Sequence, residues 1–185
     1  MNTKVLILPG WHNSGPAHWQ SLWETCYGYT RVEQHSWDAP LRGDWMAQLE
    51  QAVLANDQVV LVAHSLGCVL VAAWAAHSRN THRVKAALLV APGDVERPEM
   101  QHLLHSWSPI VRERLPFPST LVSSRNDPYC SFMRASVLAH AWGSRLVDMG
   151  PCGHINADAN LGAWPQGHAL LDELLIEEEK QHHGH

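Results

Sequence analysis

One short segment of the sequence combines a nucleophilic hydroxyl with the flanking residues that would expose it. The segment Ala63-His64-Ser65-Leu66-Gly67 follows an apolar run and precedes an alanine-rich stretch. It matches the pattern G-x-S-x-G, in which a sharp strand-to-helix turn lifts a serine hydroxyl towards the backbone N–H groups of a helix N-terminus. Ala63 stands in for the first glycine of the pattern and is also small. We therefore predict that Ser65 is a nucleophile, the alternative being a serine that only caps the following helix.

A serine nucleophile needs a general base, and the base needs a group that orients it. His154 follows the last expected strand and is the predicted base, because catalytic groups gather at the carboxyl edge of a parallel sheet. Two carboxylates that also follow strands could orient it, Asp127 and Asp94, and Asp127 is favoured because its loop adjoins the strand leading to His154. A simple turn residue is the alternative for either aspartate. His64, beside the serine, is expected to point elsewhere.

Two backbone N–H groups are predicted to stabilise the negative charge that develops on a substrate oxygen. Leu66 directly follows the serine, and Trp11 lies in the glycine-containing loop after the first expected strand. The chain also holds nine Trp against two Phe, a surplus that suits pocket walls as well as core. The residues predicted to line a substrate pocket fall in loops or at helix starts near the same sheet edge: His12, Trp19, Trp107 and Trp164.

Composition argues against several other classes of function. The formal net charge is −5 and basic residues are scattered, so nucleic acid is not an expected partner. The four Cys form no C-x-x-C pair, and His102 and His105 have no obvious third ligand, so neither a metal nor another cofactor is expected. No segment reads as a signal peptide or a membrane span, and a cytoplasmic location without membrane association is expected.

Apolar runs alternate with longer amphipathic segments along the chain. Six strands are predicted, over residues 4–8, 30–34, 58–63, 85–90, 119–123 and 144–148. Six helices are predicted between and after them, over residues 17–27, 44–56, 66–77, 98–114, 132–142 and 161–179. This alternation is typical of an α/β fold with a doubly wound, mainly parallel six-stranded sheet and helices on both faces. Residues 1–176 are expected to form a single domain, followed by a charged, frayed tail over 177–185.

Six groups of residues, in order along nearly the whole chain, resemble a known family. They are Gly10-Trp11 with Ser14, His18-Trp19 and Trp23; Ala63 to Gly67; Ser124 to Cys130; Trp142-Gly143-Ser144; Gly153 to Asn156; and Gly162 to Pro165. On these residues the chain resembles the small α/β-hydrolases of the retinoblastoma-binding-protein-like serine hydrolase family. The resemblance implies a minimal α/β-hydrolase fold without a lid domain. It also implies a catalytic triad of Ser65, Asp127 and His154 acting on small esters or amides.

The expected function is thus serine hydrolysis of a small carboxylic ester or amide through an acyl-enzyme. Two alternatives stay open. An acyltransferase would use the same residues and pass the acyl group to an alcohol or amine, and a protein-interaction module could reuse the fold without chemistry. The expected partner is a small-molecule substrate, and the sequence gives no indication of a protein partner.

Overall fold

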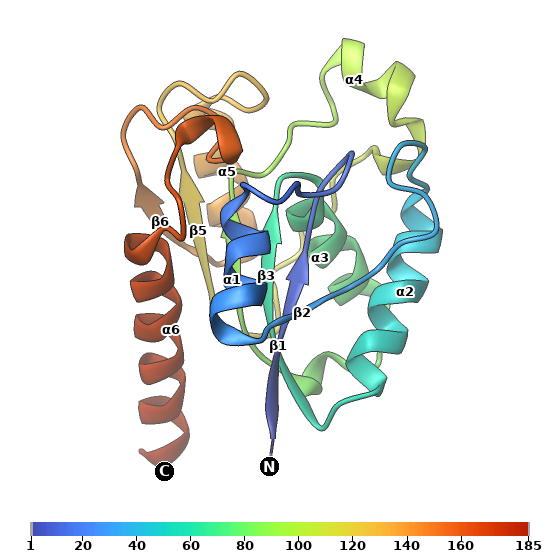
Figure 1. The fold of residues 1–185 in the computed structure, drawn as a ribbon. Coiled ribbons are helices and arrows are strands. Elements are labelled where there is room, and N and C mark those ends of the chain that lie inside the picture. Colours follow the sequence, from blue (N-terminus) through green and yellow to red (C-terminus); the bar gives the residue numbers. More distant parts are fainter. Residues whose placement is uncertain (1, 185) are drawn as a thin grey trace.

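The computed structural model describes residues 2–184, which contain a six-stranded sheet with every neighbouring pair of strands parallel. The strand order is β2-β1-β3-β4-β5-β6, and the carboxyl ends of the strands share one edge (Figure 1). The strands are β1 (Thr3–Leu8), β2 (Thr30–Arg31), β3 (Gln58–His64), β4 (Val84–Val90), β5 (Ser119–Ser123) and β6 (Arg145–Asp148). The predicted sheet is therefore confirmed, with β2 shorter than expected.

Six α-helices connect or follow the strands. They are α1 (Trp19–Tyr27), α2 (Arg42–Leu54), α3 (Leu66–His77), α4 (Pro98–Leu103), α5 (Phe132–Trp142) and α6 (Pro165–His183). Side chains cap two of them: His18 accepts the N–H of Gln20 at the start of α1, and Ser131 accepts the N–H of Arg134 at the start of α5. Among the described residues, no helix is both long and apolar enough to cross a bilayer.

The sheet buries both of its faces, and this explains its continuous apolar strands. Successive residues of a strand point to opposite faces, so Leu61 packs on the side of α2, α3 and α5 while Val60 packs on the side of α1 and α6 (Figure 1). Seven of the largest fully buried side chains are Trp. The core thus takes up most of the tryptophan surplus.

Two predicted elements differ from the structure. The helix expected over residues 98–114 ends at Leu103, because Leu104 leaves the helical region (φ −126°, ψ 48°) and a proline-rich segment follows the short turn His105–Trp107. The tail expected to fray is helical as far as His183. A side-chain pair one turn apart stabilises this end of α6: His182 Nδ1 lies 2.9 Å from the buried carboxylate of Glu178.

Candidate active site

Ser65 occupies the sharp turn between β3 and α3. Its backbone lies at φ 56° and ψ −118°, a conformation that non-glycine residues rarely adopt and that costs about 1–3 kcal/mol. Close packing holds the turn in place: the Ser65 N–H donates to the Val90 carbonyl at 3.0 Å, and α3 begins directly against the end of β1. A Cβ at Gly67 would lie 2.4 Å from the Leu8 carbonyl oxygen, so only glycine permits this approach.

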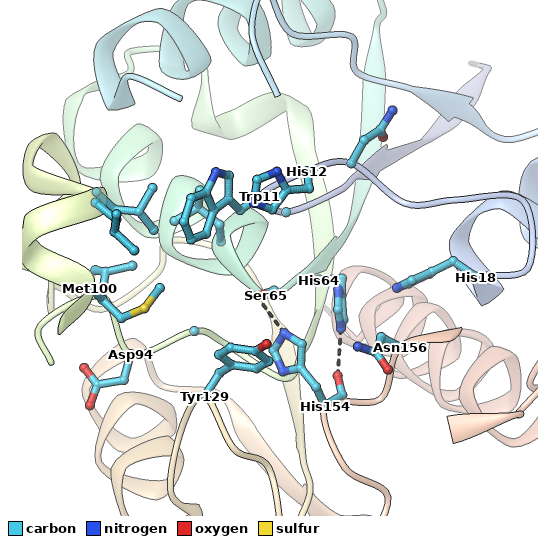
Figure 2. Close-up of a pocket in the computed structure, with 17 residues that line it drawn as sticks. Trp11, His12, His18, His64, Ser65, Asp94, Met100, Tyr129, His154 and Asn156 are labelled. Carbon is cyan, nitrogen blue, oxygen red and sulfur yellow. Dashed lines mark hydrogen bonds between the residues drawn. The ribbon is translucent and has the colours of Figure 1, made fainter. Parts of the chain in front are cut away.

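A continuous series of hydrogen bonds joins the serine to a histidine and an aspartate from two other loops. Ser65 Oγ lies 2.9 Å from His154 Nε2 (Figure 2), and His154 Nδ1 lies 3.0 Å from both carboxylate oxygens of Asp127. Asp127 follows β5 and His154 follows β6, so the parallel sheet brings them to the edge that carries Ser65. Asp127 also accepts the N–H of Tyr129, and its side chain is 2% exposed. This arrangement places the His154 proton on Nδ1 and leaves Nε2 to accept a hydrogen bond from the serine hydroxyl.

Asp94, the competing carboxylate, also lies at the wall of the site but faces a different partner. Its Oδ2 lies 3.5 Å from Nε of Arg134, which also pairs with Glu96. Figure 2 shows the Asp94 carboxylate directed away from His154. The structure therefore brings Asp127, and not Asp94, to the histidine.

The loop after β1 passes directly over the serine turn. A Cβ at Gly10 would lie 3.0 Å from Ser65 Cβ and 3.1 Å from Leu66 N, so this loop and the start of α3 are in contact. Leu66 is the first residue of α3, and its N–H has no partner one turn earlier in the helix. The Trp11 N–H meets no backbone acceptor in residues 2–184. Trp11 and Leu66 both line the cavity over Ser65.

Comparison with known proteins agrees with this geometry. A model of the serine hydrolase family matches residues 5–173. The chain belongs to the serine hydrolase family. No curated protein matches this serine hydrolase.

Solved structures of other hydrolases share the fold of this serine hydrolase. A YdeN-like hydrolase from Pectobacterium atrosepticum is 30% identical, with a TM-score of 0.84 over 96% of this chain and 92% of that one. A hydrolase of the α/β superfamily from Xanthomonas campestris is 19% identical, with a TM-score of 0.66 over 94% and 97%. Thermogutta terrifontis esterase 2 is 18% identical, with a TM-score of 0.68 over 95% and 83%. The predicted minimal α/β-hydrolase fold is confirmed.

A buried amide fixes the loop that follows β1 in the serine hydrolase. Gln20 is 0% exposed, and its Nε2 donates to the carbonyls of Leu8 (3.1 Å) and Val62 (3.2 Å) at the ends of β1 and β3. Its Oε1 accepts the hydroxyl of Ser14 at 2.7 Å. Arg31 braces the same loop by donating to the Ser14 carbonyl at 3.0 Å. Our sequence analysis missed Gln20, because a glutamine in an amphipathic helix carries no signal of inward orientation.

A cavity of about 440 Å³ opens over Ser65. Trp11 and His12 line one side of it with their rings stacked at 4.4 Å (Figure 2). The segment around α4 supplies further apolar lining from Val95, Met100, Leu103 and Leu104, and polar lining comes from His18, His64 and Asn156. The predicted pocket residue His12 is therefore at the cavity. The α4 segment was not predicted, since its contribution depends on the path of the long β4–β5 connection.

The other three predicted pocket residues are corrected by the structure. Trp19 (1% exposed), Trp107 (0%) and Trp164 (0%) belong to the core and do not line the cavity. Two of them still satisfy their indole N–H, since Trp19 donates to the Ile155 carbonyl at 2.8 Å and Trp107 to the Pro40 carbonyl at 3.0 Å. These side chains fill the space beneath the loops, where burying a large apolar ring is most favourable.

Two buried histidines lie beside His154 and stay neutral. Burial lowers the pKa of His18 to about 3, with smaller contributions from repulsion by Arg31 and by His154 when His154 is protonated. Burial also holds the pKa of His64 well below its ordinary value, again with repulsion from His154. The His64 side chain points away from the serine hydroxyl, as expected, and its Nε2–H donates to the His154 carbonyl at 2.8 Å (Figure 2). Residues 2–184 contain no cluster of three or more metal-ligating side chains.

Proposed function

We propose that this serine hydrolase cleaves small carboxylic esters or amides through an acyl-enzyme on Ser65. The observation that carries the proposal is the unbroken series of hydrogen bonds from Ser65 through His154 to Asp127, at the floor of a cavity. One structural neighbour is named an esterase, which agrees with this class of substrate. The narrower grouping with the retinoblastoma-binding-protein-like hydrolases stays a prediction, as does a cytoplasmic location.

The reaction begins when Ser65 Oγ attacks the carbonyl carbon of the substrate. His154 Nε2 takes the hydroxyl proton as the new C–O bond forms, and Asp127 stabilises the resulting imidazolium. The tetrahedral intermediate collapses, and the departing alcohol or amine takes that proton from His154. A water molecule then attacks the acyl-enzyme with His154 as general base, and the carboxylic acid leaves while Ser65 regains its proton.

The backbone N–H groups of Trp11 and Leu66 stabilise the oxyanion in both steps. The contact of Gly10 with Ser65 and Leu66 supports this assignment, because it brings the loop that carries Trp11 to the start of α3. Loss of one such donor typically costs about 3 kcal/mol of transition-state stabilisation. The size of the cavity and its apolar lining favour small substrates with an apolar arm.

Active-site labelling tests the nucleophile. We expect a fluorophosphonate probe to label the wild-type protein and the control Ser136→Ala, whose serine lies on α5 away from the cavity. Ser65→Ala should show no labelling above background. Equal labelling of wild type and Ser65→Ala would contradict the proposal.

A pair of matched substitutions tests the acid. Asp127→Asn should lower kcat by roughly 10³–10⁴-fold, because the histidine loses the group that fixes its tautomer. Asp94→Asn makes the same chemical change at a carboxylate that is paired with Arg134 and not with His154. Its rate of ester hydrolysis should stay within about threefold of the wild-type rate. The opposite ranking would reassign the acid. Product analysis with added alcohols separates hydrolysis from the acyltransferase alternative.

A further inference from the structure

His18 has an unpaired hydrogen-bond donor at the wall of the cavity. Its Nδ1 accepts the backbone N–H of Gln20 at 3.0 Å, so the proton of the neutral ring is on Nε2. That Nε2 is buried and meets no acceptor, while the residue as a whole is 4% exposed. A buried N–H without an acceptor is unfavourable. A ligand that supplied an acceptor would remove this penalty.

His64 offers the complementary group beside it. Its Nε2–H donates to the His154 carbonyl, so its Nδ1 is a lone-pair acceptor, and no donor within residues 2–184 reaches it. The His18 and His64 rings meet edge to face with their centroids 4.7 Å apart. One donor and one acceptor without protein partners are thus presented side by side, and both rings are neutral.

These two histidines lie on the opposite side of Ser65 from the apolar lining. Figure 2 shows His18 and Asn156 on one side of the serine and Met100 on the other. Asn156 also lines the cavity. Its side-chain oxygen accepts the N–H of Asp158, so the amide NH₂ of Asn156 is not used in that hydrogen bond. The cavity therefore has mostly apolar lining at α4, where the Asp94 carboxylate also lies, and neutral polar lining at the histidines.

The polar side adjoins the group that protonates the leaving atom. The His64 and His154 ring centroids are 4.8 Å apart, and the proton taken from Ser65 passes from His154 to the leaving alcohol or amine. A leaving group must approach His154 for this transfer. On the proposed mechanism, a leaving group at His154 that extends towards His64 and His18 places the acyl chain on the side of α4.

We infer that His18 and His64 form a recognition site for a hydroxyl or carboxamide group on the alcohol part of the substrate. This inference rests on the proposed function and specifies its substrate class: esters of an apolar acid with an alcohol that carries a second, neutral polar group. Such a group accepts from His18 Nε2–H and donates to His64 Nδ1. A carboxylate in its place would meet no cation on the neutral rings.

Esters of one acid that differ only in a small alcohol part test the substrate class. We expect kcat/KM for 2-hydroxyethyl butyrate and for carbamoylmethyl butyrate to exceed that for propyl butyrate by about tenfold, the usual net effect of one buried hydrogen bond. The anionic ester carboxymethyl butyrate should fall below propyl butyrate. Preference for the hydroxyl ester alone or the carboxamide ester alone would identify which polar group the site takes.

Two substitutions separate recognition from the capping role of His18. His18→Asn places an oxygen where Nδ1 caps α1 but removes the distant N–H, so the ratio of polar to propyl ester should fall to near 1. His18→Gln places a side-chain N–H about as far from the backbone as His18 Nε2 but loses the capping bond to α1. It should therefore retain most of the preference for polar over propyl ester, with a lower free energy of unfolding. His140→Phe, on the exposed end of α5, should keep the wild-type ratio.

The outcomes are distinguishable from failure of the proposed function. If the wild-type protein is labelled at Ser65 but shows a ratio near 1, the inference is wrong while the hydrolase proposal stands. A ratio that survives in His18→Asn, or is lost equally in both His18 variants, also overturns it, because the ring N–H would then not be the recognition group. Absence of labelling at Ser65 would instead refute the proposed function.

Discussion

The floor and the outer wall of the cavity are built in opposite ways. The floor, formed by Gly10, Ser65, Leu66 and Gly67, lies where strand ends and a helix start meet at backbone contact distance. The outer wall is α4 with its flanking residues; α4 itself has no buried residue, and Leu103 is 61% exposed. The floor is held by backbone contacts, whereas α4 is anchored only through its flanks, where Val95 and Leu104 are buried.

This difference separates chemistry from selectivity. Reacting groups must stay within a fraction of an ångström of their working geometry, and the floor meets that demand with backbone contacts that tolerate no added atom. Apart from Asp94, which is paired with Arg134, the wall contributes apolar surface, which many side chains can supply. Substitutions should therefore have large effects on the floor and small, substrate-dependent effects on the wall.

Adding one methyl group to the floor should give the largest effect. Gly67→Ala places a Cβ 2.4 Å from the Leu8 carbonyl oxygen, so we expect a loss of about 3 kcal/mol in the free energy of unfolding and over 100-fold in activity. Gly43→Ala makes the same change on α2 where nothing lies within 4 Å, and it should be neutral or stabilising. Denaturant unfolding and ester hydrolysis measure both. Similar stability of the two variants would show that the floor can relax.

Removing the buried amide below the floor should have the next largest effect. Gln20→Leu leaves the carbonyls of Leu8 and Val62 without their donor, so we expect a loss of about 2 kcal/mol in unfolding free energy. Activity should fall about tenfold, since the loop carrying Trp11 loses its anchor at Ser14. Gln51→Leu, on the exposed side of α2, is the matched control and should change neither. An unchanged kcat in folded Gln20→Leu would mean that Arg31 alone holds the loop.

Acid should destabilise the fold through the neutral histidines that lie beside the floor. The pKa of His18 is about 3 in the folded state, so between that value and its ordinary 6.5 the unfolded chain binds a proton that the folded chain does not. Stability is then complete above pH 6.5 and falls as the pH decreases, by about 1.4 kcal/mol per pH unit, or about 2 kcal/mol between pH 6.5 and 5.

Denaturant midpoints at pH 7, 6 and 5 measure this slope. The dependence of stability on pH should be weaker in His18→Asn. It should be unchanged in His102→Asn, because His102 is an exposed histidine of the wall. A flat profile in the wild type would mean that His18 is charged in the folded protein.

Changing the wall should have the smallest effect, and only on substrate choice. Leu103→Ser should leave the unfolding free energy within about 0.5 kcal/mol, while the preference for a longer over a shorter acyl chain falls about threefold. Leu54→Ser, a similarly exposed leucine of α2, controls for loss of surface hydrophobicity. Equal chain-length profiles in the two variants would show that the wall takes no part in binding.

The floor could be predicted from the sequence because its residues obey local rules. An apolar strand, a serine flanked by small residues and an alanine-rich helix define the turn at Ser65 without reference to the rest of the chain. The parallel sheet then limits where partners can be, and the loops after β5 and β6 bring Asp127 and His154 to hydrogen-bond distance. The six strands and their connectivity followed from the same alternation of apolar runs and helices.

The wall and the tryptophans could not be predicted, because their positions depend on packing between distant segments. Trp19, Trp107 and Trp164 lie near the correct edge in sequence terms, yet their rings turn inward, where core contacts are available. The extent of α4 depends on how the proline-rich segment crosses the sheet. The histidine pair was likewise invisible, since the orientation of His18 is set by its capping bond to α1.

The long sequence separations in this site have a consequence for biosynthesis. Ser65 and His154 are 89 positions apart, and the bond from Trp19 to Ile155 spans 136 positions. At typical translation speeds of about 5–20 residues per second, the serine leaves the ribosome roughly 4–18 s before its base. On the proposed mechanism, a nascent or truncated chain therefore carries an inert hydroxyl, and hydrolysis starts only when the last strand has joined the sheet. Activity in this protein is in effect a readout of completed folding.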